Sequence, residues 1–474
     1  MTTNGFRLTR RDVLRLGGTA AVTASFGGLL TACGSGNNPG PGVSPGTAGT
    51  GAGSQPGDLS YMFWGSTAEQ KAIETMLKSF EAAKAGRKIK PLYTPADYDT
   101  KLNALVASNK TPDLAYVQPA MGYRLGEQGK AVNIADYFDK YPELGKRLPG
   151  SYYYWDEGKC FGTQGANETI ILFTNKKAFQ EAGIDTPPVS ADTAWTWDQF
   201  VEAAYKLTID QNGKHPDEDG FDPKRVKRFG TLANMWSGGW YGLLLSAGID
   251  IVDESGKKTM IDSAAGIQVF QNLVDLMYKH RVAPSPTQLG NNAPSLSVQM
   301  ASDRLGMAID GQWALLDVST AGFDFGVGVL PKYQEPKTIT MGGATLIFNS
   351  TKYVEEALEL YVFQSDPTQV DLFSSGLWMP LEEDYYTDPE QIKKWADNAA
   401  HPAEYKTAVI DYTLNNSHAY FAQKLRNIDK IDRAISASME RLQTGKDPVQ
   451  TVIGDLAKQL NGGLLEGVYP SHPA

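Results

Sequence analysis

The sequence predicts an α/β protein with two or more lobes, and two observations indicate this fold class. First, apolar strand-like runs alternate with amphipathic helical segments along most of the chain, a pattern typical of open sheets covered by helices. Second, the chain has 474 residues, of which 41% are hydrophobic. Since one domain usually holds about 100 to 200 residues, a chain of this length is expected to divide into at least two cores.

Residues 1–32 have the layout of a removable export signal. The adjacent Arg10 and Arg11 precede an apolar stretch that glycines interrupt and that is short for a spanning helix, which needs about 20 apolar residues. The stretch ends in Leu-Thr-Ala before Cys33, where small side chains admit a peptidase and the thiol can carry a diacylglycerol. We therefore expect a lipoprotein. The arginine pair favours the twin-arginine route, whereas Val13, where such signals often carry Phe, leaves the general secretory route open.

Residues 33–57 are expected to be a lipidated Cys33 and a flexible tether, because residues 34–57 are uncharged and rich in Gly, Ser, Pro and Thr. The signal carries four Arg and one Asp, a charge of +3, so its removal changes the formal net charge from −10 to −13. A surface this acidic repels phosphates, and nucleic acid is therefore not expected as a partner. Lipidation at Cys33 also leaves Cys160, the other of the 2 Cys, without a disulfide partner.

The first part of the folded chain reads as a parallel sheet. Apolar positions in the helix that begins at Ser66 recur on one face, and turn residues separate the other segments. The carboxyl ends of parallel strands form one edge, where open sheets bind ligands. The expected strands are 59–64, 88–93 and 113–118, and the expected helices run from Ser66, over 97–109, and from 119 to a close near Gly129.

Later segments continue the strand and helix pattern. A turn at 156–158 leads to a strand at 159–163, and the apolar run 169–174 predicts another strand. Thr196 and Gln199 have the spacing of a capping box, which predicts a helix start. Four further helices are expected at 264–279, 354–364, 428–442 and 448–460.

Short segments spread over the chain occur in an order typical of one family: 111–113, 158–162, 169–175, 179–184, 187–188, 196–200, 310–313, 323–331, 342–343 and 444–447. In these segments the chain resembles extracellular solute-binding proteins of the carbohydrate ABC-importer type, family 1, which are related to maltose-binding proteins. Two departures are Cys160, where a bulky residue is usual, and a long charged insert at 212–226.

The resemblance implies a class II periplasmic-binding-protein-like fold, with two lobes that each contain an α/β sheet flanked by helices. The expected lobes are 58–167 with 344–376 and 168–343 with 377–474, joined by a hinge that the chain crosses more than once. It also implies a sugar or oligosaccharide held in the cleft, delivery to ABC permease subunits, and no cofactor. A monomer anchored by lipid to the extracellular or periplasmic face of the cell membrane is expected.

The residue chemistry independently favours a sugar, because a sugar offers an apolar C–H face and a rim of hydroxyls. Trp64, Trp236, Trp240, Trp313 and Trp378 lie near predicted strand ends or turns. The family's Gly-x-Trp segment implies a stacking ring at Trp313. A Trp is nevertheless often a core residue, and this alternative stays open for each of them.

Five other residues complete the predicted ligand site, each with a structural alternative. Glu168 enters an apolar strand where related sugar binders present a carboxylate, although it could be a solvated loop charge. Glu69 could instead serve only a capping box with Ser66. Tyr116 and Gln118 end a predicted strand, where Tyr116 could equally be core. Gly343 could admit close backbone approach or simply form a turn.

A secreted glycoside hydrolase and a binder of a non-sugar solute such as a peptide or polyamine are the rival classes. The sequence contains 54 acidic residues but singles out no catalytic pair, and its 5 His have no metal-ligand spacing. The acidic run at 217–222 suggests calcium, but it lacks a terminal bidentate acid, so a solvated loop is the better interpretation. We therefore expect a binding protein with no catalytic or metal site.

Overall fold

The computed structural model describes residues 58–290 and 293–472. The predicted signal peptide, the lipidated Cys33 and the tether lie outside the described residues. Among the helices that the structure does describe, none has both the length and the apolar character needed to cross a membrane.

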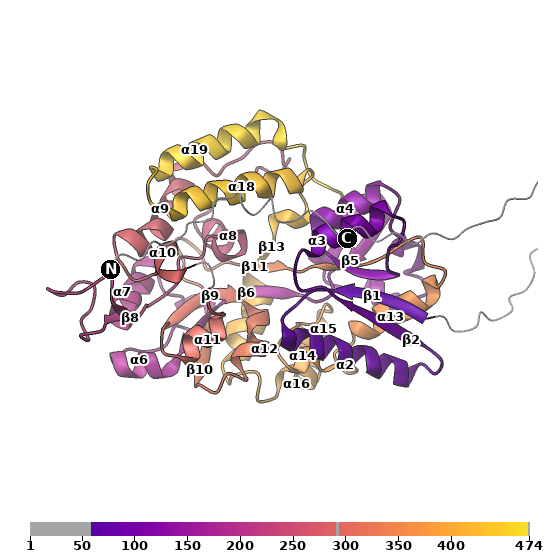
Figure 1. The fold of residues 1–474 in the computed structure, drawn as a ribbon, viewed down its shortest axis with the longest axis horizontal. Helices are drawn as coiled ribbons and strands as arrows, with labels where there is room; N and C mark the ends of the chain where they lie inside the picture. Colours follow the sequence, from indigo (N-terminus) through magenta and orange to yellow (C-terminus); the bar gives the residue numbers. More distant parts are fainter. Residues whose placement is uncertain (1–57, 291–292, 473–474) are drawn as a thin grey trace, which may run out of the picture. The chain divides into compact units, whose positions relative to one another are not determined.

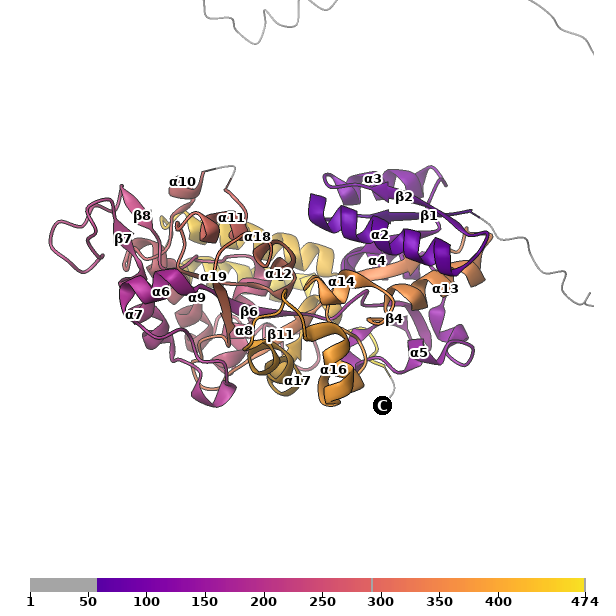
Figure 2. The same cartoon turned by 90° about the horizontal axis from the view of Figure 1, so that it is seen from below.

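The first sheet has four strands in the order β12-β3-β1-β2, of which β1 and β2 are seen side by side in Figure 1. The strands β1 (Asp58–Phe63), β2 (Lys88–Tyr93) and β3 (Leu114–Val117) are parallel, as the sequence predicts, and β12 (Ala344–Ile347) adds an antiparallel edge. The predicted helices are also confirmed here. They are α2 (Thr67–Ala83), α3 (Tyr98–Ala107) and α4 (Pro119–Glu127), and α13 (Val354–Gln364) lies beside α2 (Figure 2).

The second sheet is built around the long strand β6 (Glu168–Asn175), which confirms the predicted apolar strand. β6 pairs antiparallel with three strands, which are β9 (Met307–Gly311), β10 (Phe325–Gly328) and β11 (Thr338–Met341). β11 also pairs parallel with β13 (Ser417–Ala419).

Side chains of β6 alternate between two hydrophobic cores. Ile170 and Leu172 belong to the core beneath the helices of the second sheet, whereas Ile171 and Phe173 belong to a core that extends to the first sheet. This alternation follows from the two-residue period of a strand. Because both faces of β6 are covered, its sequence is a continuous apolar run.

The chain crosses between the two sheets more than once, which confirms the two-lobed fold with a multiply crossed hinge. Only Gly342 and Gly343 separate β11 in the second sheet from β12 in the first. Residues 164–167 make another crossing, from β5 (Lys159–Thr163) to β6. β5 forms a hairpin with β4 (Tyr152–Asp156). The predicted lobe boundaries remain a prediction.

The remaining elements cover the sheets and connect them. The capping box at Thr196 forms as predicted, and three of the four later predicted helices are α9, α18 and α19. The elements are α5 (Pro142–Gly145), α6 (Lys176–Ala182), α7 (Trp197–Leu207), β7 (Ile209–Asp210), β8 (Val226–Arg228), α8 (Ser237–Ser246), α9 (Ala264–Tyr278), α10 (Pro286–Leu289), α11 (Leu296–Ala301), α12 (Leu315–Val318), α14 (Asp371–Ser374), α15 (Asp384–Thr387), α16 (Pro389–Ala396), α17 (Tyr412–Asn416), α18 (Ile428–Gln443) and α19 (Val449–Gln459).

Candidate ligand-binding site

A cavity of about 380 Å³, called the main cavity below, lies where strands of both sheets end and where the chain crosses between them. Four Trp, one Tyr, two Glu and one Gln line it together with apolar side chains and glycine backbone. The lining residues are Trp64, Glu69, Tyr116, Gln118, Gly165, Ala166, Glu168, Trp236, Trp313, Met341, Gly342, Gly343, Leu377 and Trp378.

One wall of the main cavity is a group of aromatic rings beside the first sheet. Trp64 directly follows β1, and its ring packs edge-on against Tyr116 of β3 at 5.2 Å and against Tyr98 at 4.9 Å between ring centroids. The Tyr116 ring in turn lies 6.4 Å from that of Trp378. A Cβ atom at Gly343 would approach the Trp64 ring to 3.2 Å, so the absence of a side chain there leaves room for the ring.

The facing wall consists of Trp236 and Trp313, whose ring centroids are 6.0 Å apart. Trp236 is the N-cap residue of α8, and Trp313 lies in the turn after β9. Both rings lie over a neighbouring glycine. A Cβ atom would come within 2.0 Å of the Trp236 ring at Gly238 and within 2.2 Å of the Trp313 ring at Gly311. The pairing of each Trp with a glycine two residues away therefore shapes this wall.

Glu69 serves the helix start and the cavity at once. Its backbone N–H donates to the Ser66 hydroxyl, and its carboxylate accepts from the Ser66 backbone N–H at 3.3 Å, which closes the capping box of α2. The carboxyl group also lines the main cavity, in space that a side chain at Gly65 would occupy. Burial raises the pKa of Glu69 to about 7, and the nearby Asp317 adds to this rise.

Glu168 enters the main cavity from the other sheet. It is the first residue of β6 and pairs with Met341 of β11, next to the crossing at Gly342. Burial, together with a smaller contribution from the charge of Glu69, raises the pKa of Glu168 to about 8. Because burial disfavours the charged form of a carboxyl group, both Glu69 and Glu168 take up a proton more readily than an ordinary Glu.

One buried polar group of the main cavity wall lacks a partner within the described part of the chain. The hydroxyl of Tyr116, a residue only 7% exposed, makes no hydrogen bond there. Buried polar groups are usually paired, so this hydroxyl is suited to hydrogen-bond a polar ligand. The indole N–H groups of Trp64, Trp236, Trp313 and Trp378, which line the same cavity, are further donors.

The structure brings nine of the ten predicted ligand residues together around the main cavity, and Trp240 is the exception. Trp240 is fully buried within α8, where its ring packs against Phe270 at 5.1 Å and its indole N–H donates to the carbonyl of Met235. The prediction for Trp240 is therefore corrected: it is a core residue, because α8 is covered on every side.

Five lining residues were not predicted from the sequence: Gly165, Ala166, Met341, Gly342 and Leu377. The Gly342–Gly343 pair between two short strands was a usable signal, because such a pair allows the chain to change direction and its backbone to approach a ligand. The others contribute apolar surface or backbone and carry no recognisable local pattern.

A second, more open cavity of about 570 Å³, called the side cavity below, adjoins the main one. The two share Trp64 and Gln118 in their linings. Two acidic residues at the start of α3, Asp97 and Asp99, line the side cavity and were also missed from the sequence. Burial raises the pKa of Asp99, an effect that Arg124 opposes. Its other lining residues are Gly65, Pro95, Tyr98 and Thr100.

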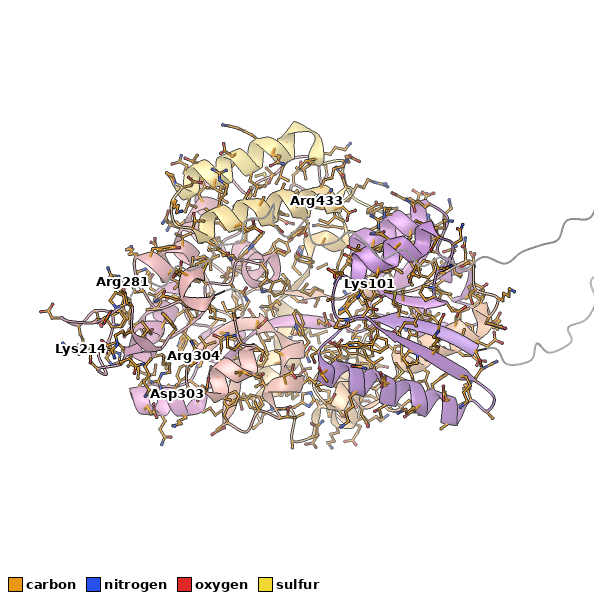
Figure 3. The ribbon with its side chains drawn as sticks, in the orientation of Figure 1. Lys101, Lys214, Arg281, Asp303, Arg304 and Arg433 are labelled. Atoms are coloured by element: carbon orange, nitrogen blue, oxygen red, sulfur yellow. The ribbon has the colours of Figure 1, made fainter. Side chains whose placement is uncertain are left out.

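The acidic run at 217–222 lies in the loop between β7 and β8, away from both cavities. In Figure 3, Lys214 of this loop lies at the left edge of the ribbon, whereas Lys101 of α3, the helix at the side cavity, lies to the right of the centre. The Asp210 carboxylate accepts backbone N–H groups from Asn212, Lys214 and Asp222, which organises the loop. No cluster of His, Cys, Asp and Glu suited to a metal ion occurs among residues 58–290 and 293–472.

Comparison with known proteins identifies relatives along most of the chain. A family profile described as bacterial extracellular solute-binding protein matches residues 75–417. The sn-glycerol-3-phosphate-binding periplasmic protein UgpB of Brucella abortus (strain 2308) is 24% identical over 427 residues, covering 86% of this chain and 93% of that protein.

Two solved structures have a similar fold. The ABC substrate-binding protein Lmo0181 from Listeria monocytogenes, in complex with cycloalternan, aligns with a TM-score of 0.73 at 20% identity, covering 85% of this chain and 98% of that one. An ABC transporter solute-binding protein from Thermotoga lettingae, bound with α-D-tagatose, aligns with a TM-score of 0.71 at 20% identity, covering 86% and 99%.

Proposed function

The chain belongs to the family of bacterial extracellular solute-binding proteins, and on that premise we propose that it captures a sugar or oligosaccharide in the main cavity and delivers it to the permease of an ABC importer. The observation that carries the proposal is the aromatic lining: rings beside each of the two sheets face one cavity that also contains carboxyl, amide and indole N–H groups. Binding requires no chemical change of the ligand.

The lining suits the two surfaces of a sugar. The Trp313 and Trp236 rings on one side, and the Trp64 ring on the other, offer flat faces for the C–H surface of a pyranose. Glu168, Glu69, Gln118 and the hydroxyl of Tyr116 offer acceptors and donors for its hydroxyl groups. Trp378 and the backbone at Gly343 complete the proposed contacts. The carbohydrates in the two similar structures support this class of ligand.

A phosphorylated ligand is disfavoured, although UgpB relatives are named for sn-glycerol-3-phosphate. Glu69 and Glu168 both face the main cavity, and within the described residues its lining contains no Lys, Arg or His. A phosphate dianion would have to approach two carboxyl groups without a compensating positive charge. We therefore propose that this chain differs from those relatives in the charge of its ligand.

We further propose that ligand binding closes the two lobes about the crossings near Gly165 and Gly342. Rings and carboxyls from both sides line the main cavity, so a ligand that contacts both sides favours the closed state. A ligand shifts such an equilibrium only by its different affinity for the two states. The proposed lobes are 58–167 with 344–376 and 168–343 with 377–474, in a monomer.

The N-terminus carries a separate proposal, that Cys33 is lipidated and anchors the mature protein to the outer face of the cell membrane, with 34–57 as the tether. Replacing Cys33 with Ala should release the protein from membranes into the soluble fraction, and mass spectrometry should then detect no acylated N-terminal peptide. Replacing Arg10 and Arg11 with Lys tests the twin-arginine route, since a general secretory signal tolerates that change.

Calorimetric titration with mono- and oligosaccharides tests the proposed ligand. We expect at least one saccharide to bind and to raise the melting temperature, since saturation at a hundredfold excess over Kd adds about 2.7 kcal/mol of stability. Trp313→Ala should weaken that binding. If peptides stabilise the protein and no saccharide does, the sugar assignment is wrong. If an oligosaccharide is cleaved during incubation, the assignment as a binding protein without catalysis is wrong.

A further inference from the structure

We propose that the preferred ligand is an amino sugar, a saccharide whose protonated amino groups lie among the carboxyl groups of the main and side cavities. The inference rests on the proposed function and narrows it, because it names the charge and the functional group of the ligand. It follows from the distribution of charge along the two cavities, from the aromatic rings between them, and from the geometry of their shared wall.

Carboxyl groups occur along the whole length of the two joined cavities. Glu168 and Glu69 enter the main cavity from opposite sheets, and Asp97 and Asp99 line the side cavity beyond Trp64. Among residues 58–290 and 293–472, neither cavity is lined by a Lys, Arg or His. A neutral sugar needs hydrogen-bond acceptors, but amides and hydroxyls serve that need with a smaller desolvation cost than the partly buried carboxyl groups of Glu69 and Glu168, whereas Asp97 and Asp99 are exposed.

The base nearest to Asp99 already has other partners. Arg124 pairs with Asp429 at 3.4 Å and donates to the Asn103 side chain at 2.7 Å. Its charge lowers the pKa of Asp99, whereas burial and Asp429 raise it. Within residues 58–290 and 293–472, Arg124 forms its ion pair with Asp429 and not with Asp97 or Asp99, so a ligand cation could pair with these two carboxylates.

The aromatic rings suit a cation as well as a sugar face. The π face of an indole attracts an ammonium group, and cages of aromatic rings with carboxylates bind such groups. Trp64 belongs to the linings of both cavities, while Trp236, Trp313 and Trp378 line the main cavity together with Glu168 and Glu69. A saccharide that spans Trp64 would place successive ring substituents beside Glu69 on one side and Asp97 on the other.

The hydroxyl of Tyr116 is a further indication of a polar ligand. Tyr116 is only 7% exposed, it lines the main cavity, and its hydroxyl has no hydrogen-bond partner among the described residues. Burial raises the pKa of Tyr116, with further contributions from Tyr61, Glu69 and Glu168, so the hydroxyl lies within the electrostatic influence of both carboxyls. An ammonium group can donate up to three hydrogen bonds, and the two carboxylates and this oxygen are acceptors in the lining of the same cavity.

Proton release distinguishes a cation from a neutral ligand. In the ligand-free cavity, burial raises the pKa of Glu69 to about 7 and that of Glu168 to about 8. The titratable groups nearby are Asp317 for Glu69, Glu69 for Glu168, and Tyr116 for both, and none of them is a base. An ammonium group stabilises both carboxylates, so its binding near neutral pH should expel protons, whereas a neutral sugar should leave them bound.

The test compares three ligands that share one skeleton and differ only at carbon 2: the β-1,4-linked glucosamine trimer, its N-acetylated form and cellotriose. The monosaccharide pairs glucosamine with glucose and galactosamine with galactose extend the comparison. Each is titrated calorimetrically at about pH 7 in two buffers of different ionisation enthalpy, which reports the protons released. We expect at least one amine to bind about tenfold or more tighter than its hydroxyl and acetamide counterparts, with proton release.

The variants Glu168→Gln and Glu69→Gln should remove the preference for the amine over its hydroxyl and acetamide counterparts, and the proton release with it. Glu254→Gln is the matched control, because Glu254 is exposed, lines neither cavity and undergoes the same change of charge. If no amine binds more tightly than its hydroxyl counterpart, the inference is overturned. Binding of the neutral members would then leave the proposed function standing, whereas an absence of binding by any saccharide would refute both.

Discussion

Replacing Trp240 with Ala is expected to destabilise the protein while leaving the main cavity intact. Trp240 has no exposed surface, and its ring lies 5.1 Å from Phe270 and 6.3 Å from Phe421 between centroids. Its indole N–H donates to the Met235 carbonyl at 3.1 Å. The substitution removes a large buried side chain and leaves that carbonyl without its donor.

The magnitude follows from these contacts. A Trp→Ala change in a core costs about 3 to 5 kcal/mol, and a buried carbonyl that loses its donor adds about 1 kcal/mol. The entropy of unfolding is about 2.1 cal/mol/K per residue, so roughly 400 residues unfolding together give about 0.8 kcal/mol/K. A total loss of about 4 to 6 kcal/mol should therefore lower Tm by about 5 to 7 °C. Trp240→Phe keeps most of the ring contacts and should lower Tm by about 1 to 2 °C.

The assay is differential scanning calorimetry, followed by titration of the folded variant with a saccharide that binds the unmodified protein. Trp313→Ala is the matched comparison, because Trp313 is partly exposed and faces the main cavity. It should change Tm little and weaken binding about tenfold. The reverse result, in which Trp240→Phe abolishes binding at unchanged Tm, would show that Trp240 contacts ligand and that this structural assignment is wrong.

Three further outcomes are expected. The folded Glu168 keeps its proton up to about pH 8, whereas the unfolded residue releases it near its ordinary pKa of 4.5, so the free energy of unfolding falls as pH rises through this window. Denaturant unfolding at about pH 5 and about pH 8.5 measures that fall, and Glu168→Gln should reduce it. An unchanged dependence of stability on pH would contradict the burial of this carboxyl. Gly311→Ala places a Cβ atom within 2.2 Å of the Trp313 ring and should displace that ring. Titration should then show saccharide binding weakened about as much as by Trp313→Ala, at nearly unchanged Tm. An unchanged affinity would mean that binding does not depend on the position of this ring. Arg228 is 2% exposed and donates at 2.8 Å to Glu181 and at 2.7 Å to Asp303, which is labelled in Figure 3. Because both acids are partly exposed, Arg228→Met should lower the free energy of unfolding in urea by about 2 kcal/mol or more. A variant more stable than the unmodified protein would refute a structural role for this cluster.

Much of the fold was predictable because its signals are local. The alternation of strand and helix, the capping boxes at Ser66 and Thr196, and the continuous apolar run of β6 each arise from a few consecutive residues. The antiparallel edge strand β12 was not predicted, since pairing direction depends on a partner more than 200 residues away in the chain.

The candidate site was predictable to the extent that side chains at strand ends converge on one edge. This rule brought Trp64, Tyr116 and Gln118 to the main cavity. Asp97 and Asp99 were missed because they begin a helix after a loop, where an acidic residue is normally a helix-terminal charge. Glu69 is both a capping residue and a cavity residue. It forms the capping box with Ser66, and its carboxyl group also lines the main cavity.

Trp236 and Trp240 separate what the sequence determined from what the tertiary structure decided. The sequence placed both beside a turn before an apolar helix. Since α8 is apolar around its whole circumference, no periodicity distinguishes a core-facing ring from a cavity-facing one. Only packing decided: Phe270 and Phe421 enclose Trp240, whereas Trp236 at the helix start is 36% exposed. Local patterns determine which residues form an element. The enclosure of a side chain depends on contacts from distant segments, which a local pattern does not contain.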